Sequence, residues 1–138
     1  MRLLVDTNVF LEVILQQQRS DEAKAFLRTF RSNDFFVGDF TVYSVGIALF
    51  RSKRHSEYID FLQDTLLHKL SHVASISALI SERLVDSATS YNLDFDDAYQ
   101  YLAAKQLGIR VVSYDSDFNR TPEGRLTPAQ VLSSASKP

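Results

Sequence analysis

The chain has 138 residues, enough for one compact domain with a sizeable hydrophobic core. It contains no cysteine, which excludes disulfides, thiolate zinc sites and cysteine nucleophiles, and is compatible with a reducing cytoplasm. The formal net charge of −2 does not indicate a strongly basic nucleic-acid-binding protein, although a local basic patch is compatible with it.

The first half of the chain alternates short apolar runs with longer amphipathic segments. The apolar run at residues 2–5 is interrupted by Asp6, so we expect a buried strand rather than a signal peptide or a membrane span, and a cytoplasmic protein. The elements expected next are helices at 8–18 and 20–32, a strand at 34–38, and helices at 39–54 and 56–70. Ser20, Asp21 and Ser56 are of the types that favour helix starts.

The second half continues this alternation. The elements expected are a strand at 71–75, helices at 77–92 and 94–108, a strand at 109–115, and a short strand followed by a helix within 125–134. Gly108 is of the type that ends a helix, and Thr127 with Pro128 is typical of a helix start. The alternation predicts an α/β domain with a mainly parallel sheet. We expect residues 1–132 to form a single domain and residues 133–138 to be a flexible C-terminal tail.

Aspartates follow two of the predicted strands. Asp6 comes directly after the first strand, Asp115 ends the strand at 109–115, and Asp117 lies two residues further on. The stretch LDFDDAYQ at 93–100 adds more aspartates at a helix start. Ligands of a parallel sheet bind beyond the carboxyl ends of its strands, so these carboxylates can meet there.

Clustered carboxylates need a proton or a cation between them. Two carboxylates about 4 Å apart repel by on the order of 4 kcal/mol at an effective dielectric constant near 20. Hard divalent ions such as Mg²⁺ or Mn²⁺ prefer oxygen ligands of this kind. His55, His68 and His72 are distant from these acids in sequence, which disfavours a zinc site.

Each aspartate alone also has a structural explanation. A single aspartate at a strand end is most often a turn or capping residue. Asp94 is the natural N-cap of the predicted helix, and Asp96 lies in its first turn, where the helix dipole favours an acid. The joint pattern of acids from three distant segments is more specific than any one of them.

These three segments resemble the PIN domains, a nuclease fold found in VapC-type toxins and many RNA-processing enzymes. LLVDTNVFL resembles the first strand of the family, with Asp6 as the first metal ligand, and DFDDAYQYLAA resembles its Asp-Ala helix start, with Asp97 as the central acid. VVSYDSDF resembles its closing T-x-D-x-x-F segment, with Ser113 at the threonine position and Asp115 as the acid. The resemblance covers nearly the whole chain and implies a three-layer α/β/α fold with a PIN-like central sheet.

The resemblance also implies a divalent-metal-dependent ribonuclease. Asp6, Asp97 and Asp115 would be catalytic and would hold Mg²⁺ or Mn²⁺, and Asp117 could bind a second ion. The polar residues that would keep these carboxylates in place are Thr7, Asn8, Ser44 and Ser113.

One position departs from the family pattern. PIN nucleases usually carry a glutamate early in the helix after the second strand, in the pattern S-x-x-T-x-x-E-L. Aligning Thr41 with that threonine places Ser44 at the glutamate position, and the only carboxylate of the segment DFTVYSVGIALF is Asp39. A serine hydroxyl can orient a water molecule but supplies no charge. The metal site would then depend on aspartates alone.

RNA binding requires cationic or aromatic contacts. The only dense basic stretch, RSKRH, offers Arg51, Lys53 and Arg54, which could contact RNA or remain solvated near a helix C-terminus. The tyrosines that could stack RNA bases, or instead pack in the core, are Tyr43, Tyr99 and Tyr101.

Two other functions remain open. Without the usual glutamate, the fold could be a non-catalytic or weakly active module that binds RNA or protein. The other hypothesis is a phosphatase or receiver domain with a strand-end aspartate. The related phosphatases, however, require a second aspartate at the position of Asn8.

The toxin resemblance implies a protein partner. A cognate antitoxin would cover the acidic groove and place a basic side chain among the carboxylates. The apolar faces of residues 9–15 and 22–30 could contact such a partner or form a homodimer, or could pack inside the monomer.

Overall fold

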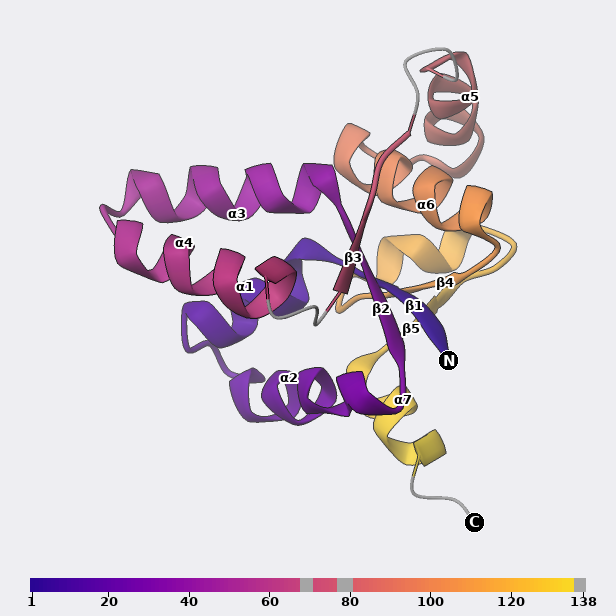
Figure 1. Cartoon of the computed structure of the whole chain (residues 1–138). Coiled ribbons are helices and arrows are strands. Elements are labelled where there is room, and N and C mark those ends of the chain that lie inside the picture. The colour runs from indigo at the N-terminus through magenta and orange to yellow at the C-terminus, as the bar shows by residue number, and fades with distance from the viewer. Residues whose placement is uncertain (68–70, 77–80, 136–138) are drawn as a thin grey trace.

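Figure 1 shows the computed structural model of the chain, which describes residues 1–67, 71–76 and 81–135. Its sheet has the order β3-β2-β1-β4-β5, and all neighbouring strands are parallel. The strands are β1 (Arg2–Val5), β2 (Asp34–Gly38), β3 (Ser71–Ala74), β4 (Arg110–Val112) and β5 (Arg125–Leu126). This confirms the predicted α/β class and the mainly parallel sheet. The strand order reverses at β1, which lies in the middle.

Helices cover both faces of the sheet, which confirms the three-layer α/β/α architecture (Figure 1). Leu3 and Val5 of β1 belong to the hydrophobic cluster on one face, and Leu4 belongs to the cluster on the other. The first face is covered by α1 (Thr7–Ile14), α2 (Ser20–Leu27), α3 (Asp39–Arg51), α4 (His55–Leu62) and α7 (Pro128–Ala135). The second face is covered by α5 (Ser81–Tyr91) and α6 (Phe95–Leu107).

Several elements end earlier than predicted. The helix predicted at 8–18 runs from Thr7 to Ile14, and Gln16 beyond it has a φ of +50°, which an α-helix does not allow. A φ of +56° at Lys53 likewise separates α3 from α4. The strand predicted at 109–115 contains only Arg110–Val112, because Asp115 begins a 3-10 helix at Ser116–Arg120.

Other segments match the predictions in part. The helix predicted at 20–32 continues beyond α2 as a 3-10 helix at Arg28–Arg31, and α4 is followed by a π-helical turn at Gln63–Leu67. The parts of the predicted helices at 68–70 and 77–80 lie outside the described residues. Helix α7 extends to Ala135, so residues 133–135 of the expected tail are helical, and 136–138 lie outside the described residues.

The predicted helix ends are mostly correct. The Asp94 side chain caps α6 by accepting a hydrogen bond from the Asp97 amide at 3.0 Å, and Gly108 ends that helix with a φ of +67°. The Thr127 hydroxyl accepts from the Gln130 amide at 3.1 Å, and the Gln130 side chain accepts from the Thr127 amide at 2.8 Å. The cap expected at Ser56 is wrong, because α4 begins at His55.

None of the helices among the described residues has both the length and the apolar character needed to cross a bilayer.

Candidate metal centre

An acidic cavity of about 240 Å³ opens at the carboxyl edge of the sheet. Asp6 directly follows β1, Asp115 follows β4, and Asp97 lies in the first turn of α6. The residues that line the cavity are Asp6, Thr7, Asn8, Leu11, Phe40, Ser44, Asp94, Asp96, Asp97, Gln100 and Asp115. The fold therefore brings together the acids that the sequence places in three distant segments, at the point where the strand order reverses.

Asp6 is buried, and several hydrogen bonds hold both of its carboxylate oxygens. Its Oδ1 accepts from the Thr7 amide at 2.8 Å and from Gln100 Nε2 at 3.0 Å, and its Oδ2 accepts from Ser113 Oγ at 2.7 Å. Burial raises the pKa of Asp6, although these hydrogen bonds act in the opposite direction. The carboxylate is thus fixed in orientation.

Asp97 is buried among like charges. Burial first, and then the carboxylates of Asp115, Asp94 and Asp6, raise the pKa of Asp97 to about 8. Its buried Oδ2 has no hydrogen-bond partner among the described residues. A buried carboxylate oxygen without a partner, facing other carboxylates, is suited to a hard divalent cation, which would supply the missing interaction.

The other two predicted acids differ in exposure and contacts. One carboxylate oxygen from each of Asp97, Asp115 and Asp117 lies within 4.8 Å of the others. Asp115 lines the cavity, and its Oδ1 accepts from the Asp117 amide at 2.8 Å. The Asp117 carboxylate lies 2.8 Å from the Arg120 guanidinium, and both side chains are about two-fifths exposed. Asp117 is therefore at the margin of the site.

Three of the predicted supporting residues form hydrogen bonds that connect the strand ends. Ser113 Oγ accepts from Asn8 Nδ2 at 3.0 Å and from the Asp115 amide at 2.9 Å, while it donates to Asp6. Asn8 also accepts from the Tyr114 amide at 3.2 Å. Thr7 Oγ1 lies 2.9 Å from Thr41 Oγ1. These contacts fix the start of α1 against the end of β4.

Ser44 lines the cavity from α3. The nearby acid of the same helix, Asp39, does not line it. The Asp39 side chain instead accepts from the Phe40 amide at 2.7 Å and from Tyr99 Oη at 2.6 Å. Helix α3 therefore contributes a hydroxyl group and no carboxylate to the cavity.

Gln100 is a central residue of the site that is absent from the sequence predictions. Its Nε2 donates to Asp6 Oδ1 at 3.0 Å and to Thr41 Oγ1 at 2.6 Å. A Cβ atom at Gly38 would lie 2.7 Å from Gln100 Oε1, so the glycine at the end of β2 leaves room for this amide. The available signal is its spacing, because Gln100 follows Asp97 by three residues on an otherwise apolar helix face.

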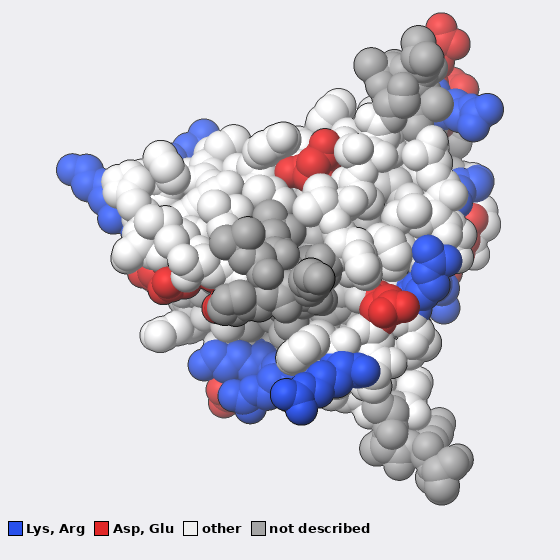
Figure 2. Space-filling model, in the orientation of Figure 1, with Lys and Arg blue, Asp and Glu red and all other residues white. Residues whose placement is uncertain are grey.

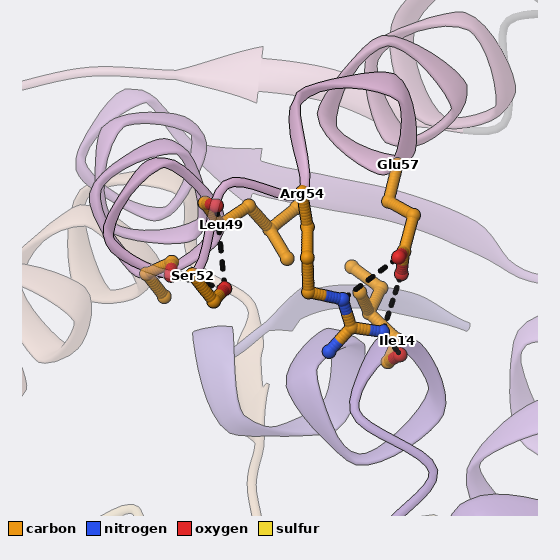
Figure 3. A network of polar contacts seen from close by, with 6 residues as sticks. Ile14, Leu49, Ser52, Arg54 and Glu57 are labelled. Carbon is orange, nitrogen blue, oxygen red and sulfur yellow. Dashed lines mark hydrogen bonds and ion pairs between the residues drawn. The ribbon is translucent and has the colours of Figure 1, made fainter.

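The predicted RNA-contact residues lie far from this cavity. Arg51 is seven residues beyond Ser44 on α3, which corresponds to roughly 10 Å along a helix axis. Arg54 extends from the α3–α4 turn between Glu57 and Ile14 (Figure 3). Its Nε donates to Glu57 Oε1 at 2.7 Å, and a terminal nitrogen donates to the Ile14 carbonyl at 2.8 Å. Arg54 thus connects α4 to the end of α1, whereas Arg51 and Lys53 are exposed.

These features can be compared with known proteins. A family model described as PIN domain matches residues 3–124. The chain belongs to the PIN-domain family. No curated protein matches this PIN domain closely enough to be counted as a relative.

Solved structures with the same fold include several at low sequence identity to this PIN domain. Mycobacterium tuberculosis VapC20, described as a sarcin-ricin loop cleaving toxin, has a TM-score of 0.73 and 18% identity, over 90% of this chain and 98% of that chain. A toxin–antitoxin complex from Klebsiella pneumoniae has a TM-score of 0.65 and 21% identity, over 91% and 97%. PAE2754 from Pyrobaculum aerophilum has a TM-score of 0.66 and 18% identity, over 99% and 100%.

Proposed function

We propose that this PIN domain is a divalent-metal-dependent endoribonuclease that hydrolyses RNA phosphodiester bonds. The observation that carries the proposal is the unpartnered, buried Oδ2 of Asp97 in a cavity shared with Asp6 and Asp115. These three carboxylates would hold Mg²⁺ or Mn²⁺, and Asp117 lies close enough to assist with a second ion. When bound, the ion would activate water and stabilise charge on the scissile phosphate.

The protein's own contribution is to orient the carboxylates. Ser113 and Gln100 donate to different oxygens of Asp6, so its carboxylate cannot rotate without losing both hydrogen bonds. Asn8 donates to Ser113, and Thr7 contacts Thr41, which accepts a hydrogen bond from Gln100. Ser44 is the hydroxyl group on the α3 side of the cavity, available to a water molecule or a phosphate oxygen.

The Asp6→Asn variant tests this function. It keeps the shape of the side chain but removes its charge, so we expect loss of Mn²⁺ binding and of metal-dependent cleavage of single-stranded RNA. The Asp34→Asn variant is the control, because Asp34 is exposed at the opposite end of the sheet. Binding is followed by calorimetry and cleavage by gel electrophoresis, with circular dichroism to confirm folding. Equal cleavage by wild type and Asp6→Asn would contradict the proposal.

A non-catalytic binding module is the second candidate, favoured by the serine at position 44. This candidate predicts that wild-type protein binds no Mn²⁺ near neutral pH and cuts no RNA. A Ser44→Glu variant adds the carboxylate that the family pattern contains. Cleavage gained only in this variant would favour the binding module for the natural chain.

We propose further that the chain is the toxin of a toxin–antitoxin pair. The support is the shared fold with toxin structures, including the Klebsiella pneumoniae complex. A groove of about 460 Å³ lies between α1, α2 and α4, and Val13, Leu27 and Phe30 are among its lining residues. It includes parts of the apolar faces expected at 9–15 and 22–30, although Phe10 and Phe26 are buried in the monomer. An antitoxin segment would occupy this groove and reach the acidic cavity.

A homodimer is proposed through a different surface, the α3–α4 face, formed by Tyr43, Ile47, Phe50 and Ile59. Each of these side chains is more than half exposed, and together they border a shallow hollow with very little polar surface. Figure 2 shows few charged side chains over α3 and α4, whereas Lys and Arg gather over α2. Large exposed apolar patches often mark interfaces, and an uncharged face can pair with its own copy without burying charge.

A further inference from the structure

Three aromatic rings form a cluster beside the acidic cavity. The ring centroids of Phe40 and Phe95 lie 5.8 Å apart, those of Phe40 and Tyr99 lie 5.6 Å apart, and those of Phe95 and Tyr99 lie 6.2 Å apart. Phe40 comes from the start of α3, and the other two come from the start of α6. We call this cluster the aromatic shelf.

The aromatic shelf is continuous with the candidate metal centre. Phe40 itself lines the acidic cavity. Phe95 stands between Asp94 and Asp96 in the sequence, and both of these neighbours line the cavity as well. A molecule with a phosphate group in the cavity would therefore have its adjacent chemical groups near these rings.

Hydrogen bonds and ring contacts hold Tyr99 and Phe40 of the aromatic shelf in place. Tyr99 Oη donates to Asp39 Oδ1 at 2.6 Å and accepts from the Ile76 amide at 3.3 Å, so its ring is fixed from two sides. Asp39 is in turn held by the Phe40 amide. The shelf is thus organised before any ligand binds, which lowers the entropic cost of binding.

Phe95 is the exposed member of the shelf. It is 57% exposed, although its ring contacts both Phe40 and Tyr99. Packing within the monomer therefore covers only part of its surface. The first turn of a helix favours acidic and polar residues, so the helix itself gives no reason for an exposed phenylalanine here.

We propose that the aromatic shelf stacks one unpaired base of the RNA substrate, next to the phosphate held over the carboxylates. This inference rests on the proposed function. Aromatic rings bind single-stranded nucleic acid by stacking on its bases, and every base offers a flat face. A base inside a duplex is already stacked on its neighbours, so Phe95 favours single-stranded over paired RNA.

Equilibrium binding tests the shelf independently of cleavage. A short single-stranded RNA with one 2-aminopurine is titrated with protein carrying Asp115→Asn, which prevents cutting, in the presence of Mg²⁺. Adding Phe95→Ala or Phe95→Leu is expected to weaken binding by roughly 5- to 100-fold, the range for loss of one stacked base. Adding Phe95→Tyr should retain binding, because tyrosine also stacks. Quenching of 2-aminopurine fluorescence at one position should disappear with Phe95→Ala.

Two controls separate stacking from other roles of Phe95. Val85→Ala removes an apolar side chain of the same exposure, 57%, on α5 and should not change RNA affinity. Duplex RNA of the same sequence should bind equally to wild-type and Phe95→Ala forms of the background protein. Thermal melting of each variant confirms that it is folded.

The possible outcomes decide between the hypotheses. Unchanged affinity of Phe95→Ala, or full retention of affinity by Phe95→Leu, overturns the stacking role, even if wild-type protein cleaves RNA. The latter result would instead indicate an apolar contact with RNA that does not require an aromatic ring. Phe95-dependent binding in a protein whose wild-type form cuts no RNA supports the shelf and contradicts the proposed catalysis. Absence of RNA binding by every form overturns the shelf.

Discussion

The ionised form of the Asp97 side chain is less stable in the folded protein than in water. Burial and three neighbouring carboxylates raise its pKa from 3.8 to about 8. In metal-free protein, the folded state therefore holds this proton more tightly than the unfolded chain does. Stability associated with this group is greatest below about pH 4, falls as the pH rises through the interval up to about 8, and then levels off. A bound cation would remove this cost.

The Asp97→Asn variant should therefore be more stable than wild type in metal-free buffer. We expect a melting temperature at least ~3 °C higher at pH 8, the shift that about 1 kcal/mol produces in a chain of this size, and a smaller difference at pH 5. Calorimetry in EDTA at both pH values measures this. Saturating Mn²⁺ should stabilise only the wild type. The same pH dependence in Asp97→Asn as in the Asp34→Asn control would show that Asp97 does not carry this charge penalty.

Gln100 has no charge, yet it positions Asp6. Gln100→Leu removes both donated hydrogen bonds while keeping a similar volume, so Asp6 loses one of the contacts that orient it. We expect the dissociation constant for Mn²⁺ to rise by roughly 10- to 100-fold, which is typical of losing a partner behind a metal ligand. Calorimetric titration measures this.

The matched control is Gln106→Leu, at an exposed position of the same helix, which should bind Mn²⁺ as wild type does. Similar Mn²⁺ affinities for Gln100→Leu and wild type would mean that the remaining contacts hold Asp6 without help.

At the scale of elements, α6 connects the site to the core. Its first turn carries Asp97, its next turn carries Gln100, and its buried face packs on the sheet. Its end is equally well defined, because Gly108 adopts a φ of +67° and its amide donates to the carbonyls of the last turn. The position of the acids therefore depends on a helix that is fixed at both ends.

Gly108→Ala should destabilise the protein by about 1 kcal/mol, because a side chain disfavours positive φ. Apart from the adjacent residues, no atom in the part of the chain that the structure describes lies within 4 Å of the added Cβ, so the effect comes from the backbone. Chemical denaturation measures the change in the free energy of unfolding. Gly108→Asn should cost less, since asparagine tolerates this conformation. A larger loss with asparagine than with alanine would contradict the backbone explanation.

The sequence was sufficient to predict the order of strands and helices but not all of their ends. Apolar runs such as that of β1, and capping residues such as Asp94 and Gly108 at the ends of α6, specify element type locally. The end of α1 depends on a positive φ at Gln16 and on the contact between Arg54 and Ile14, forty residues away in sequence. Such tertiary contacts leave no local pattern, so the helix predicted at 8–18 was too long.

At the scale of the whole molecule, the α3–α4 face is the surface that we expect to form a homodimer. An Ile47→Glu variant places a charge in its centre, so paired copies would bring like charges together. We expect the wild type to sediment as a dimer at micromolar concentration and the variant as a monomer. Val85→Glu is the control, because Val85 is similarly exposed on α5. A monomeric wild type would exclude this dimer.

The candidate site could be anticipated from the sequence only where it consists of strand ends and helix starts. Asp6, Asp97 and Asp115 follow from the topology of a parallel sheet, and the structure places all three on one cavity. The aromatic shelf could not be anticipated, because Phe40 and Phe95 become neighbours only when α3 and α6 meet across the carboxyl edge of the sheet. Their spacing in sequence carries no sign of that contact.

The central place of β1 has a consequence for the chain during its synthesis. Asp6 receives its hydrogen bond from Ser113, which lies 107 residues further along the chain. A ribosome adds about 5–20 residues per second, so Ser113 is synthesised on the order of 5–20 seconds after Asp6. The neighbouring acid Asp115 leaves the exit tunnel later still. On the proposed function, the chain could not cut the ribosome or the messenger that are producing it until the segment with Ser113 and Asp115 is released.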